Sequence, residues 1–207
     1  MSALEPSGVS ASTCGSRFLS FLRHFFRQGK TIGAVVPTSQ RVARRMARLA
    51  GIESAKAVAE FGPGTGAITT HLLGAMPASG RLWGFEVYEP FIEYLRDAVR
   101  DARFMLLGES AETIEQVRAT AVEAAGGFDA VVSSIPFSLI GPEQSVVILR
   151  AVAKVLRPGG SFVALQYHPK FLAPLLHAQF EVVEREFHLV HLPPVFLFRA
   201  RNPRRTW

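Results

Sequence analysis

Residues 57–72 read AVAEFGPGTGAITTHL: a short apolar run, three closely spaced glycines and the start of a helical pattern. The apolar run predicts a buried strand with Glu60 near its end. Gly62, Gly64 and Gly66 allow the backbone to turn tightly and to approach a ligand closely. We therefore expect a strand, a ligand-binding turn and a helix in that order, which is the repeating unit of an α/β sheet.

The chain beyond residue 53 continues this alternation of apolar runs and helical patterns. Strands are predicted near residues 56–61, 81–86, 103–107, 128–133, 160–166, 180–187 and 194–201. Helices are predicted at about 65–74, 89–101, 111–124, 141–156 and 168–178. The pattern favours a doubly wound, mostly parallel sheet with helices on both faces. The connection through Pro193 and Pro194 is too short for a crossover helix, so we expect the last strand to enter antiparallel.

A second carboxylate supports a nucleotide site at the glycine-rich turn. Glu86 ends the second predicted strand in the run WGFEVYEP, and a carboxylate at this place can accept both hydroxyls of a ribose. Ligands of such sheets lie where strands end and helices begin. The turn is therefore predicted to hold a nucleotide rather than to serve packing alone.

Two kinds of nucleotide remain possible at this point. Gly62, Gly64 and Ala67 fit a dinucleotide fingerprint loosely, but the chain has no second domain to present a substrate to a nicotinamide. In a methyltransferase the acid two residues before the first glycine is itself useful, because it attracts the positively charged methionine end of S-adenosylmethionine. Glu60 fills that place.

Two other ligand classes are not supported by the motifs. The run GKT at residues 29–31 lacks the earlier glycine of a phosphate-binding loop, since position 24 is His24. His188 and His191 have no cysteine near them and do not form a recognisable metal-binding motif. We expect no metal.

Composition and charge indicate the cellular setting. The chain has 207 residues, of which 48% are hydrophobic and 19% charged, as expected for one globular domain with an extension. Its single cysteine, Cys14, has no partner thiol, which favours a reducing compartment. The net charge of +6 comes entirely from residues 1–50, which hold eight basic side chains and one acidic side chain, because the rest of the chain is close to neutral. A further arginine cluster ends the chain, and both basic regions suggest a polyanionic partner, either nucleic acid or an anionic membrane. That cluster is Arg199, Arg201, Arg204 and Arg205.

The N-terminal region contains an amphipathic segment, RFLSFLRHFFRQGK, at residues 17–30. On a helix its apolar side chains gather on one side, and the segment is too short and too charged to span a bilayer. It can lie on a membrane surface, or dock on the body of the protein as amphipathic helices usually do. The apolar residues are Phe18, Leu19, Phe21, Leu22, Phe25 and Phe26, and the basic ones are Arg17, Arg23, Arg27 and Lys30.

Several motifs together resemble the class I S-adenosylmethionine-dependent methyltransferases. They are EFGPGTG, GFEVYEP, LLGESAE, DAVVSSIPF and VLRPGGSFVALQY, in the order and spacing typical of that superfamily. The flanking runs GKTIGAVVPTSQRVARRMA and HLPPVFLFR, together with SSIPF, resemble bacterial phospholipid N-methyltransferases, which convert phosphatidylethanolamine stepwise towards phosphatidylcholine. This resemblance implies a Rossmann-like methyltransferase fold, S-adenosylmethionine as cofactor and a phospholipid as substrate.

The resemblance also implies roles for particular residues. Glu60 and the glycine-rich turn would contact the cofactor, Glu86 its ribose, Glu109 and Ser110 its adenine, and the run TIGAVVP would fold over its methionine end. The implied cofactor-binding residues are Ile32, Gly33, Glu60, Gly62, Gly64, Thr65, Gly66, Glu86, Val87, Glu109, Ser110 and Ser133.

The run SSIPF, residues 133–137, resembles the N-[LI]-P-[YF] loop of adenine N6-methyltransferases, a group that includes the rRNA adenine dimethyltransferases. Here Ser134 stands in place of the asparagine, and a serine cannot supply the same pair of contacts to an exocyclic nitrogen. The departure favours an aliphatic amine over a nucleobase. We expect Ser134, Phe137 and Tyr167 to line the catalytic pocket, where the Tyr167 ring can stabilise a methylated cation through its π face. His168 is a further candidate for this pocket, but its position before Pro169 favours a structural role.

The sequence therefore predicts N-methylation of phosphatidylethanolamine and its partly methylated derivatives at a membrane surface. The alternatives are an RNA adenine N6-methyltransferase, which would use Arg41 to Arg48 on phosphates, and a membrane-associated protein that binds the cofactor without catalysis. We expect a flexible leader at residues 1–16, amphipathic and basic helices for membrane binding and cofactor closure at 17–50, and the methyltransferase domain at 51–207. We expect a cytoplasmic monomer, bound peripherally to the cytoplasmic face of the membrane, with nucleic acid not its partner.

Overall fold

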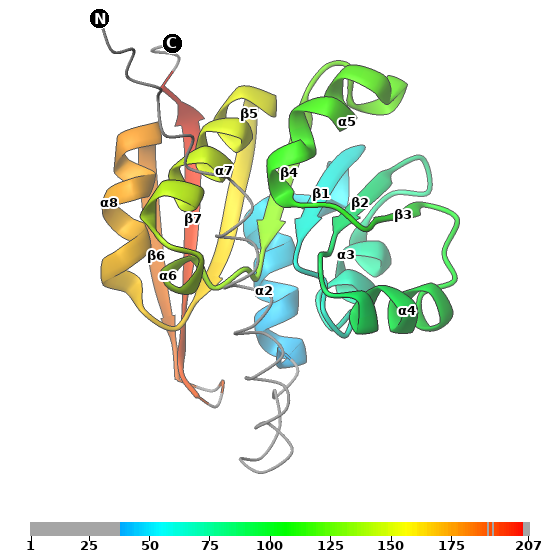
Figure 1. Cartoon of the computed structure of the whole chain (residues 1–207), viewed down its shortest axis with the longest axis horizontal. Helices are drawn as coiled ribbons and strands as arrows, with labels where there is room; N and C mark the ends of the chain where they lie inside the picture. Colours follow the sequence, from blue (N-terminus) through cyan, green and yellow to red (C-terminus); the bar gives the residue numbers. More distant parts are fainter. Residues whose placement is uncertain (1–37, 190, 192, 205–207) are drawn as a thin grey trace, which may run out of the picture. The chain divides into compact units, whose positions relative to one another are not determined.

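Seven strands form one sheet in the order β3-β2-β1-β4-β5-β7-β6, in a computed structural model that describes residues 38–189, 191 and 193–204 (Figure 1). In chain order they are β1 Ala57–Phe61, β2 Arg81–Phe85, β3 Phe104–Leu107, β4 Phe128–Ser133, β5 Leu156–Gln166, β6 Phe180–His188 and β7 Val195–Pro203. Strands β1 to β5 pair in parallel, and β7 is antiparallel to both of its neighbours. The predicted Rossmann-like sheet with an antiparallel last strand is confirmed.

The last strand in the chain is not the last strand in the sheet. β7 lies between β5 and β6, and its side chains Val195, Leu197, Phe198 and Ala200 are buried. β6 carries more charged residues than β7, and all of its positions after Phe180 are partly or fully exposed. Charged side chains need solvent and protect an edge strand from unwanted pairing, so β6 takes the edge and the more apolar β7 the interior.

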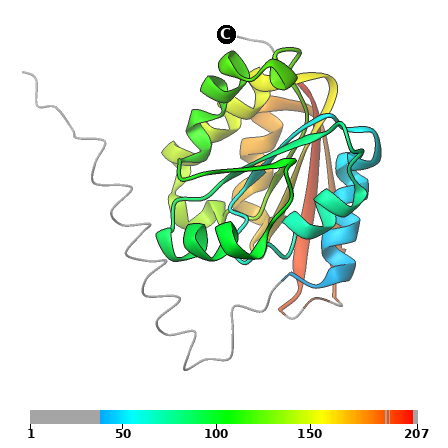
Figure 2. The same ribbon diagram turned by 90° about the vertical axis from the view of Figure 1, so that its right-hand side faces the viewer.

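Helices cover both faces of the sheet (Figure 2). α2 and α3 pack together on one face, whereas α5, α7 and α8 pack in series on the other. The short helix α6 contacts α7 and α8. The helices are α2 Gln40–Ala50, α3 Thr69–Ala75, α4 Glu89–Ala98, α5 Ile114–Thr120, α6 Phe137–Ile140, α7 Pro142–Val155 and α8 Pro169–Gln179.

Helix α2 is held by defined caps and by one apolar face. The Ser39 side chain accepts a hydrogen bond from the Val42 amide at 3.5 Å, and Gly51 ends the helix in the left-handed region with a φ of 69°. Its buried side chains, Met46 among them, join the core above β4, β5 and β7, while Arg41, Arg44 and Arg48 are exposed. The predicted amphipathic segment Phe18 to Phe26 and the predicted lid with Ile32 and Gly33 lie outside the described residues.

Some element boundaries differ from those that the sequence predicted. The helix expected from residue 65 begins at Thr69, because the preceding glycines take positive φ values that no α-helix contains. The helix expected at 111–124 is divided into the 3₁₀ turn Ala111–Thr113, α5 and the 3₁₀ turn Val122–Ala124. β5 begins at Leu156 rather than 160, with a register shift opposite β4. Helix α6 was not predicted.

Candidate functional site

Three loops begin at the same level where the parallel strands β1, β2 and β4 end. The Gly62 amide donates to the Phe85 carbonyl at 2.9 Å, and the Ser134 amide donates to the Phe61 carbonyl at 3.0 Å. The rings of Phe61 and Phe85 meet edge to face beneath them, with centroids 5.4 Å apart. The glycine-rich loop, the loop after β2 and the SSIPF loop are thereby fixed to one rigid edge of the sheet.

The glycine-rich loop depends on glycine for two separate reasons. Gly64 has a φ of 57°, a conformation that costs other residues free energy, and its amide donates to Glu86 Oε2 at 3.1 Å. Gly66 has a φ of 76°, and a Cβ atom there would lie 3.2 Å from Leu95 Cδ2. The loop therefore requires glycine both for its backbone course and for the close approach of α4. Thr65 between them is exposed.

Glu86 joins the loops after β1 and β2. Its buried carboxylate accepts from the amides of Val87 at 2.9 Å and Tyr88 at 3.0 Å, in addition to Gly64. Burial raises the pKa of this carboxyl, and the three amide donors partly oppose that rise. A carboxylate offers about four acceptor positions, so three amides leave one, which suffices for one of the two ribose hydroxyls but not for both. The predicted contact with a ribose fits this count for one hydroxyl and stays a prediction.

Glu60 lies at the end of β1 and is 1% exposed. Its Oε2 accepts a hydrogen bond from the Thr69 hydroxyl at 2.7 Å, whereas Oε1 is buried with no hydrogen-bond partner among the described residues. Burial raises the pKa of the Glu60 carboxyl to about 8, and the nearby negative charge of Glu86 adds to the rise. A buried acceptor without a donor suits a positively charged ligand group, so the residues present fit the methionine end of S-adenosylmethionine.

The SSIPF loop is tied to the glycine-rich loop. The Ser134 hydroxyl donates to the Gly62 carbonyl at 2.6 Å, and the Ile135 amide donates to Ser133 Oγ at 3.3 Å. Ser133 itself is buried. Ser134 therefore links the two loops as well as standing at the predicted catalytic position.

Gln166 holds the far side of the same loop. Its Nε2 donates to the Ile135 carbonyl at 2.7 Å, and its Oε1 accepts from the Phe137 amide at 3.3 Å. Sequence reasoning missed Gln166, and it also missed the contact of Thr69 with Glu60. The available signal was a polar residue at the carboxyl end of the apolar strand β5, which is unusual unless the side chain has partners.

Two of the predicted catalytic side chains differ strongly in environment. Phe137 is completely buried, and its ring lies edge to face with Phe162 at a centroid distance of 6.3 Å. The structure thus gives the Phe137 ring a packing role, and its catalytic role stays a prediction. Tyr167 is exposed at the end of β5, and partial burial of its hydroxyl raises its pKa.

His191 lies beside Tyr167, with ring centroids 6.4 Å apart, and is almost completely buried. Its Nδ1 is 2.8 Å from the Pro193 carbonyl oxygen. A carbonyl oxygen can only accept, so Nδ1 carries the proton and Nε2 of the neutral ring is an acceptor. Nε2 is buried and has no hydrogen-bond partner among the described residues. In the sequence His191 stands out only as a possible metal ligand, a role that the motifs do not support.

The remaining predicted cofactor residues lie at the same edge of the sheet, beyond β3. Glu109 is exposed, and Ser110 caps the 3₁₀ turn Ala111–Thr113 by accepting from the Glu112 amide at 3.5 Å. Among the described residues, no hydrogen bond or ion pair joins them to Glu60 or Glu86. Their predicted role toward an adenine stays a prediction.

Other features of the described residues lie apart from this edge. A surface hollow of about 360 Å³, lined by Arg118, Lys154 and Arg157 among others, lies where β4 and β5 begin, at the opposite edge. No group of three or more His, Cys, Asp or Glu side chains in the described chain is arranged to hold a metal ion. In the same residues, no helix is both long and apolar enough to cross a bilayer.

Comparisons with known proteins agree with this geometry. Residues 58–160 match the family described as Methyltransferase domain. The chain is 27% identical over 192 residues to the ornithine lipid N-methyltransferase of Singulisphaera acidiphila, an alignment that covers 92% of this chain and 98% of that protein.

Solved structures show the same fold. The N-methyltransferase NodS from Bradyrhizobium japonicum WM9 superposes with a TM-score of 0.62 at 20% identity, covering 80% of this chain and 96% of that chain. The precorrin-6y C5,15-methyltransferase from Geobacter metallireducens GS-15 superposes with a TM-score of 0.61 at 17% identity, covering 82% and 92%. Both likenesses extend over most of the sheet and its helices.

Proposed function

Because this chain carries a class I S-adenosylmethionine-dependent methyltransferase domain, we propose that it methylates the amine of a membrane lipid headgroup, with phosphatidylethanolamine as the substrate. The observation that carries the proposal is the match to a lipid N-methyltransferase over 98% of that protein's length. The match extends well beyond residues 58–160 and so takes in chain on both sides of the cofactor-binding core. The phosphatidylethanolamine assignment rests on the flanking motifs described above.

The named relative supports a second candidate substrate, the amine of an ornithine lipid. Both candidates present an aliphatic amine at a bilayer surface, so the same site chemistry serves either. RNA adenine methylation is not favoured, because the curated relative acts on a lipid and because Ser134 replaces the asparagine of adenine-specific loops.

The cofactor would be held by the edge where β1 and β2 end. Glu60 Oε1 would face its positively charged methionine end, Glu86 would accept from its ribose, and the glycine-rich loop would lie against it. Val87, Thr65, Ser133, Glu109 and Ser110 complete the proposed contacts, and Ile32 and Gly33 would close over them. When bound, S-adenosylmethionine supplies a methyl group that its sulfonium already activates, so the protein needs to align the amine and keep it unprotonated.

The substrate side of the site would perform that task. A lipid amine must lose a proton before each methyl transfer, and Nε2 of His191, buried without a hydrogen-bond partner among the described residues, would accept it. The adjacent Tyr167 ring would stabilise the methylated cation. Ser134 would keep the SSIPF loop against the glycine-rich loop, which fixes the distance between amine and cofactor.

A lipid substrate also requires a membrane contact. The predicted amphipathic segment, Phe18 to Phe26 with its basic neighbours, would supply one, and basic residues near an anionic surface contribute about 1 kcal/mol each. The protein would then act as a monomer bound peripherally to the cytoplasmic face of the membrane.

The test is transfer of a labelled methyl group from S-adenosylmethionine to vesicles of phosphatidylethanolamine and phosphatidylglycerol. Ornithine lipid vesicles and bulk RNA serve as parallel substrates. Label in mono-, di- or trimethylated phosphatidylethanolamine is expected. Label in ornithine lipid alone would transfer the proposal to that lipid, and label in RNA alone would overturn it.

A further inference from the structure

The β6–β7 hairpin projects past the edge of the sheet that holds the site. The pairing register places Phe61, Ser133, Ala164, Phe198 and Arg185 in one row across the sheet. β1 and β4 end at this row, whereas β6 continues beyond it. A strand rises about 3.3 Å per residue, so His188, the last residue of β6 and three residues after Arg185, lies roughly 10 Å past the row, and Leu189 follows it. Figure 1 shows the hairpin extending farther than the ends of β1 and β4, on the β6 side of the sheet.

The projecting part exposes large apolar side chains. Phe187 is 52% exposed and Leu189 is 71% exposed, and Pro193 and Pro194 beside them are exposed as well. The Phe187 ring stacks on the ring of Phe196 with a centroid distance of 4.6 Å. An aromatic pair is thus already formed on the surface, where its apolar area faces water in the described chain. Such area calls for an apolar partner.

We call this apolar end the hairpin tip and define it as Arg185, Phe187, Leu189, Pro193, Pro194 and Phe196. Basic side chains occur within the tip and on α2. The Arg185 guanidinium lies 5.6 Å from the centre of the Phe196 ring. On α2, whose first turn lies at the same end of the sheet in Figure 1, Arg41 and Arg44 are exposed.

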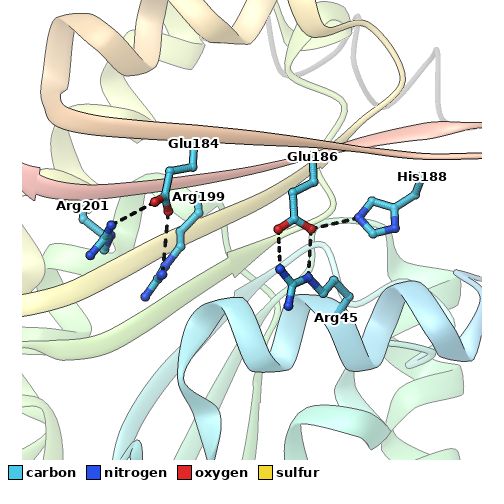
Figure 3. A network of polar contacts seen from close by, with 6 residues as sticks. All are labelled: Arg45, Glu184, Glu186, His188, Arg199 and Arg201. Atoms are coloured by element: carbon cyan, nitrogen blue, oxygen red, sulfur yellow. Dashed lines mark hydrogen bonds and ion pairs between the residues drawn. The ribbon is translucent and has the colours of Figure 1, made fainter.

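The acidic side chains nearest the hairpin tip are neutralised (Figure 3). Glu184 pairs with Arg199 at 3.7 Å and Arg201 at 3.1 Å. Glu186 pairs with Arg45 through both carboxylate oxygens and with His188 at 3.2 Å. The charge that remains around the tip is therefore positive.

We propose that the hairpin tip inserts into the interfacial layer of an anionic membrane and presses the substrate side of the site against the lipid headgroups. Exposed aromatic and leucine side chains with an arginine at their border suit the boundary between acyl chains and headgroups. The positive surroundings match an anionic bilayer, and the tip projects from the edge where a headgroup amine must enter. The inference rests on the proposed lipid substrate, and it adds a membrane contact separate from the N-terminal segment.

Insertion is measured on the full chain with a Leu189→Trp variant and vesicles of phosphatidylethanolamine and phosphatidylglycerol. The fluorescence of the introduced Trp at position 189 is obtained by subtracting the spectrum of the parent chain. On binding, this emission is expected to shift to shorter wavelength and to be quenched by lipids brominated on the acyl chain. Val122→Trp is the matched control, because Val122 is 87% exposed on the 3₁₀ turn Val122–Ala124. A Leu189→Trp signal no more quenched than that of Val122→Trp overturns the proposal.

Binding is measured by vesicle flotation with the Phe187→Ser/Leu189→Ser double variant. Its partition into vesicles is expected to fall at least about tenfold, because two large apolar side chains no longer leave water. Cofactor binding, followed by calorimetry, should be unchanged and shows that the variant is folded. Introducing Phe187→Ser/Leu189→Ser into the Phe21→Glu/Phe25→Glu variant measures the contribution of the hairpin tip to vesicle binding separately from that of the N-terminal segment. Unchanged partition in both backgrounds overturns the proposal.

The two proposals fail in different ways. If the parent chain methylates lipid amines and Leu189→Trp stays in water, the hairpin proposal is wrong and the proposed function stands. If Leu189→Trp inserts but no lipid amine is methylated, in vesicles or as a short-chain monomer, the proposed function is wrong and the membrane contact is upheld.

Discussion

The carboxylates at the glycine-rich edge and those on the β6–β7 hairpin differ in burial and in the kind of partner that binds them. At the glycine-rich edge, Glu60 and Glu86 are buried and are held by donors close in the chain or in adjacent loops. On the hairpin, Glu184 and Glu186 of β6 are partly exposed and are held by arginines of β7 and α2. Buried carboxylates cost free energy unless a ligand or donor uses them, whereas exposed ion pairs cost and contribute little. The first region therefore has the properties expected of a ligand-binding site, and the second has those of a protein surface.

The largest effect is expected for Glu86→Ala. The change leaves the amides of Gly64, Val87 and Tyr88 without their acceptor, and hydrogen bonds to a charged group contribute about 1.5–3 kcal/mol each. We expect cofactor affinity, measured by calorimetry, to fall at least about 100-fold, and the free energy of unfolding in denaturant to fall as well. Glu89→Ala, which removes an exposed ion pair to Arg96, is the control and should change neither. Near-normal affinity in Glu86→Ala would contradict this account.

Glu60→Gln tests the buried carboxylate through pH. The pKa of Glu60 is raised from 4.5 to about 8 in the folded chain, so the folded state holds the proton more tightly than the unfolded state. The resulting stability is fully present below about pH 4.5 and is lost as pH rises to about 8. Unfolding measured in denaturant across this range should show the loss in the parent chain and a flatter profile in Glu60→Gln.

Cofactor binding should depend on pH in the opposite direction to stability, and Glu60→Gln tests this as well. A positively charged ligand favours the ionised carboxylate, so the affinity of the parent chain should rise with pH up to about 8. Glu60→Gln should bind roughly 10- to 100-fold more weakly at high pH and show no such rise. Equal pH profiles of binding in both chains would show that Glu60 does not face the cofactor.

Ser134→Ala tests the link between the two loops of the site. It removes the hydroxyl that donates to the Gly62 carbonyl at 2.6 Å, a contact of about 0.5–1.5 kcal/mol in stability. Methyl transfer should fall several-fold or more, since the amine and the cofactor lose their fixed spacing, while cofactor affinity changes less. Ser138→Ala, four residues along in α6, is the control. A larger loss of binding than of methyl transfer would place Ser134 on the cofactor alone.

The smallest effect is expected for Arg45→Gln in α2, which removes the partner of Glu186 on the hairpin. Arg45 pairs with Glu186, but their side chains are 41% and 33% exposed, and exposed pairs contribute about 0.2–1 kcal/mol. The free energy of unfolding should fall by less than about 1 kcal/mol, and added salt should reduce the difference. A double-mutant cycle with Glu186→Gln measures the coupling, and Arg44→Gln is the control. A loss as large as that of Glu86→Ala would remove the distinction between the two regions.

Local patterns in the sequence predicted most of the fold. Seven strands, the helices between them and the antiparallel entry of the last strand follow from apolar periodicity and from the shortness of the connection at Pro193 and Pro194. The glycine-rich turn and the two carboxylates beside it also follow from the sequence, because a positive φ and a strand end are properties of a few adjacent residues. Adjacent residues carry such information whatever the rest of the chain does.

Only the tertiary structure decided which side chains meet. Three features could not be predicted, because the sequence does not show which residues become partners. They are the place of β7 between β5 and β6, the contact of Thr69 with Glu60 and the hydrogen bonds of Gln166 to the SSIPF loop. For the same reason Phe137 lies in the core, and Nε2 of His191 is buried without a hydrogen-bond partner among the described residues. Each outcome depends on which arrangement buries the most apolar surface while satisfying buried polar groups, and that balance is a property of the whole packed chain.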